Sequence, residues 1–314
     1  MTPSSDQTPD HLTQSPHVQP SAPRITVLMT VLNGMPYLPE AVESILAQTL
    51  PDLLLLVIND GSTDGTASYL DSVDDSRLIV RHLPKTIGRT PALNLGFSEI
   101  TTPYTAILDG DDVALPSRLA RQVAFLDTTP DVAMVAADYL LVDPHGNSLG
   151  QVECPAKHAP LVNLLAVQNV IAHSACSFRT TAVRFVGGYP PEYDYAQDMG
   201  LWLALLQQGN RIASLPETLA HIRVHPAQAT QNPAKVRLRR QEAVWLAHGL
   251  CDVPGISADA RQVARLREGI FLLRLHRWRE GFRSLYCGLA MGPIRLLRNS
   301  LLRQRLALSL RKRR

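Results

Sequence analysis

The sequence predicts an α/β protein with a single, mostly parallel sheet flanked by helices, followed by a helical extension. Apolar runs with the length of buried strands alternate with segments of helical periodicity, and Asn-Gly or Asp-Gly pairs follow successive runs. From about residue 235 onward only helical patterns occur. With 45% hydrophobic residues, the 314-residue chain has enough apolar material for one large domain or two modest ones.

The alternation begins at 24–34 with a β-branched, apolar run that predicts a buried strand, and continues at 37–50 with helical spacing. A second strand at 53–60 precedes a helix for which Ser62 or Thr63 is the expected N-cap. Further strands and helices are expected at 77–83, 90–100, 104–109 and 115–129. Strands that alternate with helices predict a parallel sheet covered on both faces.

The rest of the chain is assigned from composition and looser patterns. Segments 172–180, 197–209 and 217–225 read as strand-like or helix-like parts of the same domain. The first residues are rich in Pro, Ser, Thr and Gln and have little to bury, which predicts a disordered tail. The expected organisation is a tail at 1–23, one domain at 24–232 and a basic helical extension at 233–314.

The overall charge of +3 conceals an uneven distribution. Between 261 and 314 fifteen Lys and Arg stand against two Glu, a net charge of +13 that leaves −10 for the rest. Arginines interleaved with Leu, Phe and Trp at helical spacing suit an amphipathic helix on an anionic membrane surface. They equally suit a helical extension that packs on the domain and leaves its arginines in water. No nucleic-acid-binding module is recognised, so no nucleic-acid partner is expected.

Cysteine spacing and hydropathy indicate the compartment. The four cysteines are widely spaced without a C-x-x-C pair, which fits a reduced setting and implies no structural zinc. No apolar segment approaches the roughly 20 residues that span a bilayer, and the first residues lack a signal-peptide pattern. We expect a cytoplasmic protein whose basic end can hold it at the inner face of the cell membrane.

Adjacent carboxylates follow the fourth expected strand, where Asp109, Asp111 and Asp112 fall within four residues. Such carboxylates raise each other's pKa unless a cation lies between them, and hard oxygen ligands suit Mg²⁺ or Mn²⁺. An ordinary Asp-Gly turn would use the same residues. Ligand sites in open α/β sheets lie beyond the carboxyl ends of the strands, so the strand exits at Asn33 and Asp60 belong to the same edge.

Five segments in this order resemble the family 2 glycosyltransferases of the GT-A fold. They are TVLMTVLNGMPYLPEAVESILAQTLPDLLLLVINDGSTDGT, TIGRTPALNLG, ILDGDDVALPSRLARQ, YAQDMGLWLALLQQG and HIRVHP. The resemblance covers about 24–226. It implies one nucleotide-sugar-binding GT-A domain that transfers a sugar to an acceptor hydroxyl with inversion at the anomeric carbon.

The resemblance also implies residues that receive the nucleotide. These are Thr30, Asn33, Asp60, Arg89 and Asn94. Asp60 corresponds to the aspartate that contacts the base, and Arg89 lies in a segment that flanks the nucleotide. The family more often has aspartate where this chain has Asn59, and asparagine where it has Thr86.

Further roles follow from the acidic and the late motifs. The resemblance places Asp109 near the ribose or sugar and makes Asp111 a ligand of Mn²⁺ or Mg²⁺, with Asp112 in a structural role. It makes His225 another metal ligand and Arg223 a phosphate contact. A divalent ion would neutralise the charge that develops on a departing diphosphate.

Asp198 stands just ahead of an apolar helical face. That face consists of Leu201, Trp202, Leu205 and Leu206. As a first-turn or capping residue Asp198 would be worth about 0.5–2 kcal/mol. The resemblance makes it the general base for the acceptor hydroxyl, in a motif that is usually Glu-Asp and is Gln197-Asp198 here. One residue can fill both roles.

The sequence therefore predicts a metal-dependent, inverting glycosyltransferase that moves a hexosyl or deoxyhexosyl unit from a nucleotide-diphosphate donor to a glycan or lipid-linked acceptor. Cell-surface polysaccharide synthesis is the expected setting. Trp202 lacks the Gln-x-x-Arg-Trp companion of processive synthases, which favours one sugar per encounter. A catalytically silent sugar-nucleotide-binding or scaffold protein and a nucleotidyltransferase are the alternatives. His173 fits an acceptor-side residue or a structural histidine equally well.

Overall fold

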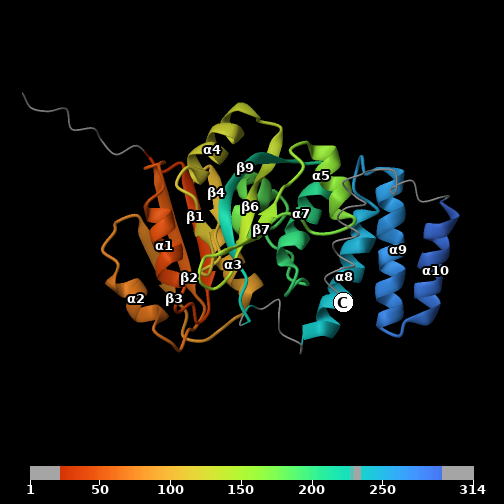
Figure 1. Ribbon diagram of the computed structural model, residues 1–314, viewed down its shortest axis with the longest axis horizontal. Helices are drawn as coiled ribbons and strands as arrows, with labels where there is room; N and C mark the ends of the chain where they lie inside the picture. Colours follow the sequence, from red (N-terminus) through yellow and green to blue (C-terminus); the bar gives the residue numbers. More distant parts are fainter. Residues whose placement is uncertain (1–21, 227, 229–234, 292–314) are drawn as a thin grey trace, which may run out of the picture.

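A nine-stranded sheet forms the centre of the protein (Figure 1). The computed structural model describes residues 22–226, 228 and 235–291. The strand order is β3-β2-β1-β4-β8-β6-β9-β5, with β7 paired to β6. Helices cover the sheet, and the three helices that follow its last strand in the chain stand side by side at one end of the molecule (Figure 1). The predicted fold class is confirmed, whereas most of the expected tail and the chain beyond 291 lie outside the described residues.

The amino-terminal half alternates strand and helix as its apolar periodicity predicts, except that a two-residue strand that was not expected, β5, directly follows β4. Its elements are β1 (Ile25–Val31), α1 (Leu38–Leu46), β2 (Leu53–Asn59), α2 (Thr66–Ser72), β3 (Leu78–His82), α3 (Arg89–Glu99), β4 (Tyr104–Ile107), β5 (Val113–Ala114) and α4 (Arg118–Thr128). Strands β3, β2, β1 and β4 run parallel. Successive side chains of a strand face opposite sides, so Leu28 joins the core of α3 while Val27 joins that of α1.

Helix α2 begins later than the sequence predicts. Its N-cap is Gly65, and the Asp64 carboxylate accepts the Thr66 N–H at 2.9 Å. The expected cap at Ser62 or Thr63 is wrong, because these residues bind the loop after β1 instead. The Ser62 hydroxyl accepts the Asn33 N–H at 2.9 Å, and the Thr63 N–H donates to the Asn33 side chain at 2.8 Å. The exits of β1 and β2 are thereby tied together.

The second half of the domain is built on a long strand that the sequence pattern does not predict. Its elements are β6 (Val132–Val142), β7 (Ser148–Val152), α5 (His158–Leu165), η1 (His173–Ala175), β8 (Ser177–Arg179), α6 (Thr180–Phe185), α7 (Gln197–Gln207) and β9 (Arg211–Arg223). Strand β6 pairs in parallel with β9 and antiparallel with β7 and β8. All four residues expected on the apolar face of α7 are buried.

Three helices follow the domain: α8 (Val236–Leu250), α9 (Ala258–Arg274) and α10 (Trp278–Ala290). Helices α9 and α10 approach closely through small residues. A Cβ on Gly269 would lie 2.9 Å from the Gly281 carbonyl oxygen, and one on Gly288 would lie 2.8 Å from the Leu266 side chain. None of the described helices has both the length and the apolarity to cross a bilayer. The four cysteines, all within the described ranges, are free thiols.

Candidate functional site

A cavity of about 980 Å³ opens at the carboxyl ends of β1, β2 and β4. Parallel strands gather the polar residues that follow them at one edge of a sheet, which is why distant motifs meet here. Eight of the ten residues expected in the site line this cavity: Thr30, Asn33, Asp60, Arg89, Asp109, Asp111, Asp198 and His225.

The Asp60 carboxylate is held rigidly by the loop before α3. It is 4% exposed and accepts hydrogen bonds from the Thr86 hydroxyl at 2.8 Å, the Ile87 N–H at 2.7 Å and the Gly88 N–H at 3.1 Å. Gly88 has φ 94°, a left-handed conformation that favours glycine. Thr86, where the family usually has asparagine, therefore orients Asp60 directly.

The acidic segment after β4 forms a compact cluster. Ligand oxygens of Asp109, Asp111 and Asp112 lie within 4.8 Å of one another. The His225 Nε2 lies 3.0 Å from the Asp111 carboxylate. Three carboxylates beside an imidazole form a donor set that suits a hard divalent cation such as Mn²⁺ or Mg²⁺.

The three aspartates have different surroundings. Burial alone would raise the pKa of Asp109, but the Arg89 guanidinium at 2.5 Å and the nearby His173 outweigh burial and hold this pKa well below its usual range. Burial, together with the charges of its neighbours, raises the pKa of Asp112 well above its usual range. Asp112 bonds to the Ser174 hydroxyl at 2.5 Å and the Arg223 N–H at 2.8 Å, which fits a structural role.

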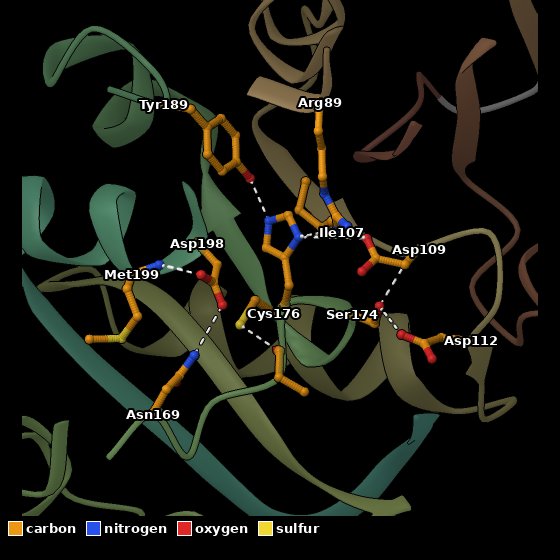
Figure 2. A network of polar contacts seen from close by, with 12 residues as sticks. Arg89, Ile107, Asp109, Asp112, Asn169, Ser174, Cys176, Tyr189, Asp198 and Met199 are labelled. Atoms are coloured by element: carbon orange, nitrogen blue, oxygen red, sulfur yellow. Dashed lines mark hydrogen bonds and ion pairs between the residues drawn. The ribbon is translucent and has the colours of Figure 1, made fainter. Parts of the chain in front are cut away.

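His173 connects the acidic cluster to the core. Its Nε2 lies 2.8 Å from the Tyr189 hydroxyl, and its Nδ1 lies 3.6 Å from the Asp109 carboxylate. Figure 2 shows this network, with Asp109 and Asp198 on opposite sides of it. The ring is 7% exposed and also lines the cavity. His173 is thus held by structural contacts and also faces the cavity, and a role on the acceptor side stays a prediction.

Asp198 lies in the first turn of α7 and faces the cavity. Its carboxylate accepts the Asn169 amide N–H at 3.0 Å and the Met199 N–H at 2.7 Å (Figure 2). Burial raises the pKa of Asp198, and these donors together with His173 and Arg89 oppose that shift in part. A carboxylate with a raised pKa beside open space is a suitable proton acceptor. Asn169, on an irregular segment, has no periodic signal that could reveal it from sequence.

Gln197 bridges the two sides of the cavity. With its amide oxygen toward Arg89, it accepts from the guanidinium Nε at 3.0 Å, and its amide nitrogen donates to the Tyr195 carbonyl at 2.8 Å. A glutamate, which the family usually has here, could accept from Arg89 but could not donate to that carbonyl. The neutral residue therefore satisfies both neighbours.

Two expected site residues are engaged elsewhere. Within the described part of the chain, neither Asn94 nor Arg223 lines the cavity. The Asn94 amide makes two hydrogen bonds of 2.8 Å to the backbone of Tyr189. The Arg223 guanidinium, 3% exposed, donates to Glu40 at 2.6 Å and to the Asp111 carbonyl at 3.0 Å. Both brace the walls of the cavity, so their expected contacts with the nucleotide are not supported by this geometry.

Comparisons with known proteins identify the family to which the chain belongs. Residues 26–182, half of the chain, match the model of "Glycosyl transferase family 2". The putative glycosyltransferase EpsE of Bacillus subtilis is 30% identical over 213 residues, 65% of this chain and 74% of that protein. The O-antigen biosynthesis glycosyltransferase WbnJ of Escherichia coli is 28% identical over 214 residues, 67% of this chain and 83% of that protein.

Among solved structures, the mannosyltransferase PcManGT from Pyrobaculum calidifontis, in complex with GDP-Man and Mn²⁺, has a TM-score of 0.59 and 20% identity. The match covers 95% of this chain and 85% of that one, and it shows a common fold. Family membership favours glycosyl transfer over the nucleotidyl-transfer alternative. The chain therefore belongs to glycosyl transferase family 2 and is a glycosyltransferase.

Proposed function

We propose that the protein transfers a hexosyl or deoxyhexosyl unit from a nucleotide-diphosphate sugar to an acceptor hydroxyl with inversion. The observation that supports this proposal best is that one cavity holds both the acidic cluster and Asp198. Asp198 is a separate carboxylate with a raised pKa, and the His173 network lies between it and the cluster. The glycan is a cell-surface polysaccharide or a lipid-linked precursor, in line with the O-antigen setting named for WbnJ.

The acidic cluster is the proposed metal site. Asp111 and His225 would hold Mn²⁺ or Mg²⁺, with their ligand atoms 3.0 Å apart at the cavity wall. The bound metal would neutralise charge on the departing diphosphate. Asp112 is buried behind this pair and holds the end of β9 in place through the Arg223 N–H. The presence of Mn²⁺ in the PcManGT complex supports this assignment.

The nucleotide would lie along the exits of β1 and β2. Asp60, with its carboxylate already fixed by three donors, receives the base, and Thr30 and Asn33 line the same pocket. The Arg89–Asp109 ion pair orients the Asp109 carboxylate toward the ribose or sugar. The side chains are thus held before the donor arrives, which lowers the ordering cost of binding.

Asp198 is the proposed general base. A direct inversion needs one proton acceptor on the face of the sugar opposite the leaving diphosphate, and no covalent intermediate. Asp198 takes the proton of the acceptor hydroxyl as the oxygen attacks the anomeric carbon. Asn169 and the Met199 N–H orient its carboxylate for that step.

Nucleotide-sugar turnover tests the proposal. Incubation with Mn²⁺ and a panel of α-linked UDP- and GDP-sugars should release nucleoside diphosphate slowly, with water in place of the acceptor. Proton NMR of the sugar, recorded before mutarotation, should show the β-anomer first. An α-anomer would contradict inversion. Nucleoside diphosphate binding without turnover of any donor or acceptor would favour the silent sugar-nucleotide-binding protein.

The extension supplies a proposed contact with an anionic membrane. Helix α10 turns its small residues inward and leaves four large side chains exposed on the opposite side: Trp278, Phe282, Tyr286 and Leu289, between 54% and 74% exposed. Arg279 and Arg283 are exposed beside this α10 stripe. The sequence from Arg295 to Arg314 adds eight Lys and Arg and no acidic residue. Interfacial aromatics with flanking arginines suit the inner, anionic face of the cell membrane.

Vesicle binding tests the α10 stripe. Replacing Trp278 and Phe282 with serine should lower sedimentation with phosphatidylglycerol vesicles roughly tenfold or more, since each buried aromatic contributes about 1.5–3 kcal/mol. Phe185→Ser is the matched control, because Phe185 is 75% exposed on α6 and lies outside the stripe. Equal losses in the two variants would count against the α10 stripe as the contact, and equal binding to phosphatidylcholine vesicles would count against a preference for an anionic membrane.

A further inference from the structure

One buried carboxylate of the extension grips the segment that precedes α7. Glu242 of α8 is 0% exposed. Its oxygens accept the backbone N–H groups of three consecutive residues, Asp194 at 3.0 Å, Tyr195 at 3.1 Å and Ala196 at 2.7 Å. Ala196 is the N-cap of α7 and has no side chain that could cap the helix. Glu242, which lies 46 residues from Ala196, therefore satisfies the N–H of the N-cap residue and those of the two residues before it.

The same side of α8 holds the side chains of this segment. Residues spaced by three and four positions share one helix face, so these contacts form a single interface. The pairs are Lys235 with Asp194 at 3.0 Å, the Arg239 guanidinium over the Tyr195 ring at 5.2 Å, and Trp245 edge-to-face with Tyr193 at 6.0 Å. Asp194, Tyr195 and Lys235 also line the cavity. The extension is therefore part of the cavity wall on the Asp198 side.

We propose that Glu242 is a positioning residue for Asp198. This inference rests on the role of Asp198 under the proposed function. The three N–H groups precede Asp198 by two to four residues, so their anchoring sets where the first turn of α7 begins. Gln197, whose amide bridges Arg89 and the Tyr195 carbonyl, depends on the same anchored segment. A shift of this segment would move the base relative to the sugar and leave the exits of β1 and β2 in place.

The test compares Glu242→Gln with Glu268→Gln in the full chain. Glutamine keeps the size of Glu242, but its NH₂ group would oppose a backbone N–H. Glu268 is the matched control, a buried carboxylate of α9 that bonds to Ser284 at 2.6 Å and His248 at 2.9 Å within the extension. Glu242→Gln should lower kcat for donor turnover roughly 10- to 100-fold, because a small displacement of a catalytic group has an effect of this size. Its Kd for UDP or GDP with Mn²⁺ should stay within about twofold, and Glu268→Gln should retain kcat.

Amide hydrogen exchange provides a readout that needs no turnover. Exchange in a peptide covering 193–199 should be faster in Glu242→Gln than in wild type and unchanged in Glu268→Gln. Wild-type kcat in Glu242→Gln, or equal losses in both variants per folded molecule, would overturn the inference. If wild type shows no turnover, the proposed function fails, and the exchange rates alone decide whether Glu242 anchors the segment. Full activity in Asp198→Asn would refute the role of Asp198 as the general base, but it would not refute the anchoring of the segment by Glu242.

Discussion

Replacing Asp198 with asparagine should lower kcat for sugar transfer roughly 10²- to 10⁴-fold, the usual contribution of a general base. The amide keeps the shape of the carboxylate but cannot accept the proton of the acceptor hydroxyl. Binding of UDP or GDP with Mn²⁺ should remain close to that of wild type, because the nucleotide would lie at the exits of β1 and β2. Turnover and isothermal titration calorimetry measure the two effects separately.

The dependence of the rate on pH provides a second test of Asp198 as the general base. Burial raises the pKa of Asp198, and the base acts only when it is deprotonated, so the wild-type rate should fall as pH drops through this raised pKa. Asn169→Ala removes a donor to the carboxylate. The charged form then loses support, the pKa rises further, and the acid limb should move to higher pH. Near-normal kcat in Asp198→Asn, or an acid limb that Asn169→Ala leaves in place, would contradict the assignment.

Replacing Asp111 with alanine should abolish metal-dependent nucleotide binding. Asp111 lies 3.0 Å from His225 at the cavity wall, and its loss leaves a single proposed ligand. A metal that stabilises a departing diphosphate contributes several kcal/mol, so turnover should fall roughly a thousandfold or more. Calorimetric titration with UDP and GDP, each with Mn²⁺ and again with EDTA, measures the binding. The nucleotide that binds also identifies the base of the donor.

Glu217→Ala is the control for Asp111, since it removes a surface carboxylate that pairs with Arg121 at 2.5 Å outside the cavity. This variant should bind like wild type, because a surface ion pair contributes little. Tight nucleotide binding that is indifferent to EDTA and to Asp111→Ala would return the acidic segment to the role of an ordinary turn.

The parts of the site that follow strands were predictable from sequence. Asn33, Asp60 and Asp109 come directly after apolar runs, and parallel strands bring such exits to one edge whatever the rest of the fold. The acidic cluster was also predictable, because its chemistry depends on residue types that the sequence itself shows. Asn94 and Arg223 show the limit of motif position, because neighbours that the motif does not specify engage both side chains.

The remaining features depend on tertiary contacts without a local signal. Strand β6 is buried along most of its length, and its apolar run shows no alternation that separates it from a buried helix. Asn169 and Glu242 act on residues 29 and 46 positions away, through contacts that no periodicity encodes. Helix α2 begins later than predicted because Ser62 and Thr63 bind Asn33. Asn33 follows the neighbouring strand of the sheet and is distant in the sequence, so no local pattern indicates this contact.

The pairing of β6 with β9 has a consequence for the order in which the molecule is built. Met134 pairs with Ile212 and Val142 with Arg223, so this pair of strands joins residues 78 to 81 positions apart. Such distant partners meet late, because a long loop must close first. The Arg223 N–H that Asp112 accepts arrives only with the end of β9. During synthesis the first strands can assemble early. The edge of the sheet that carries the site is complete only after β9 has been synthesised.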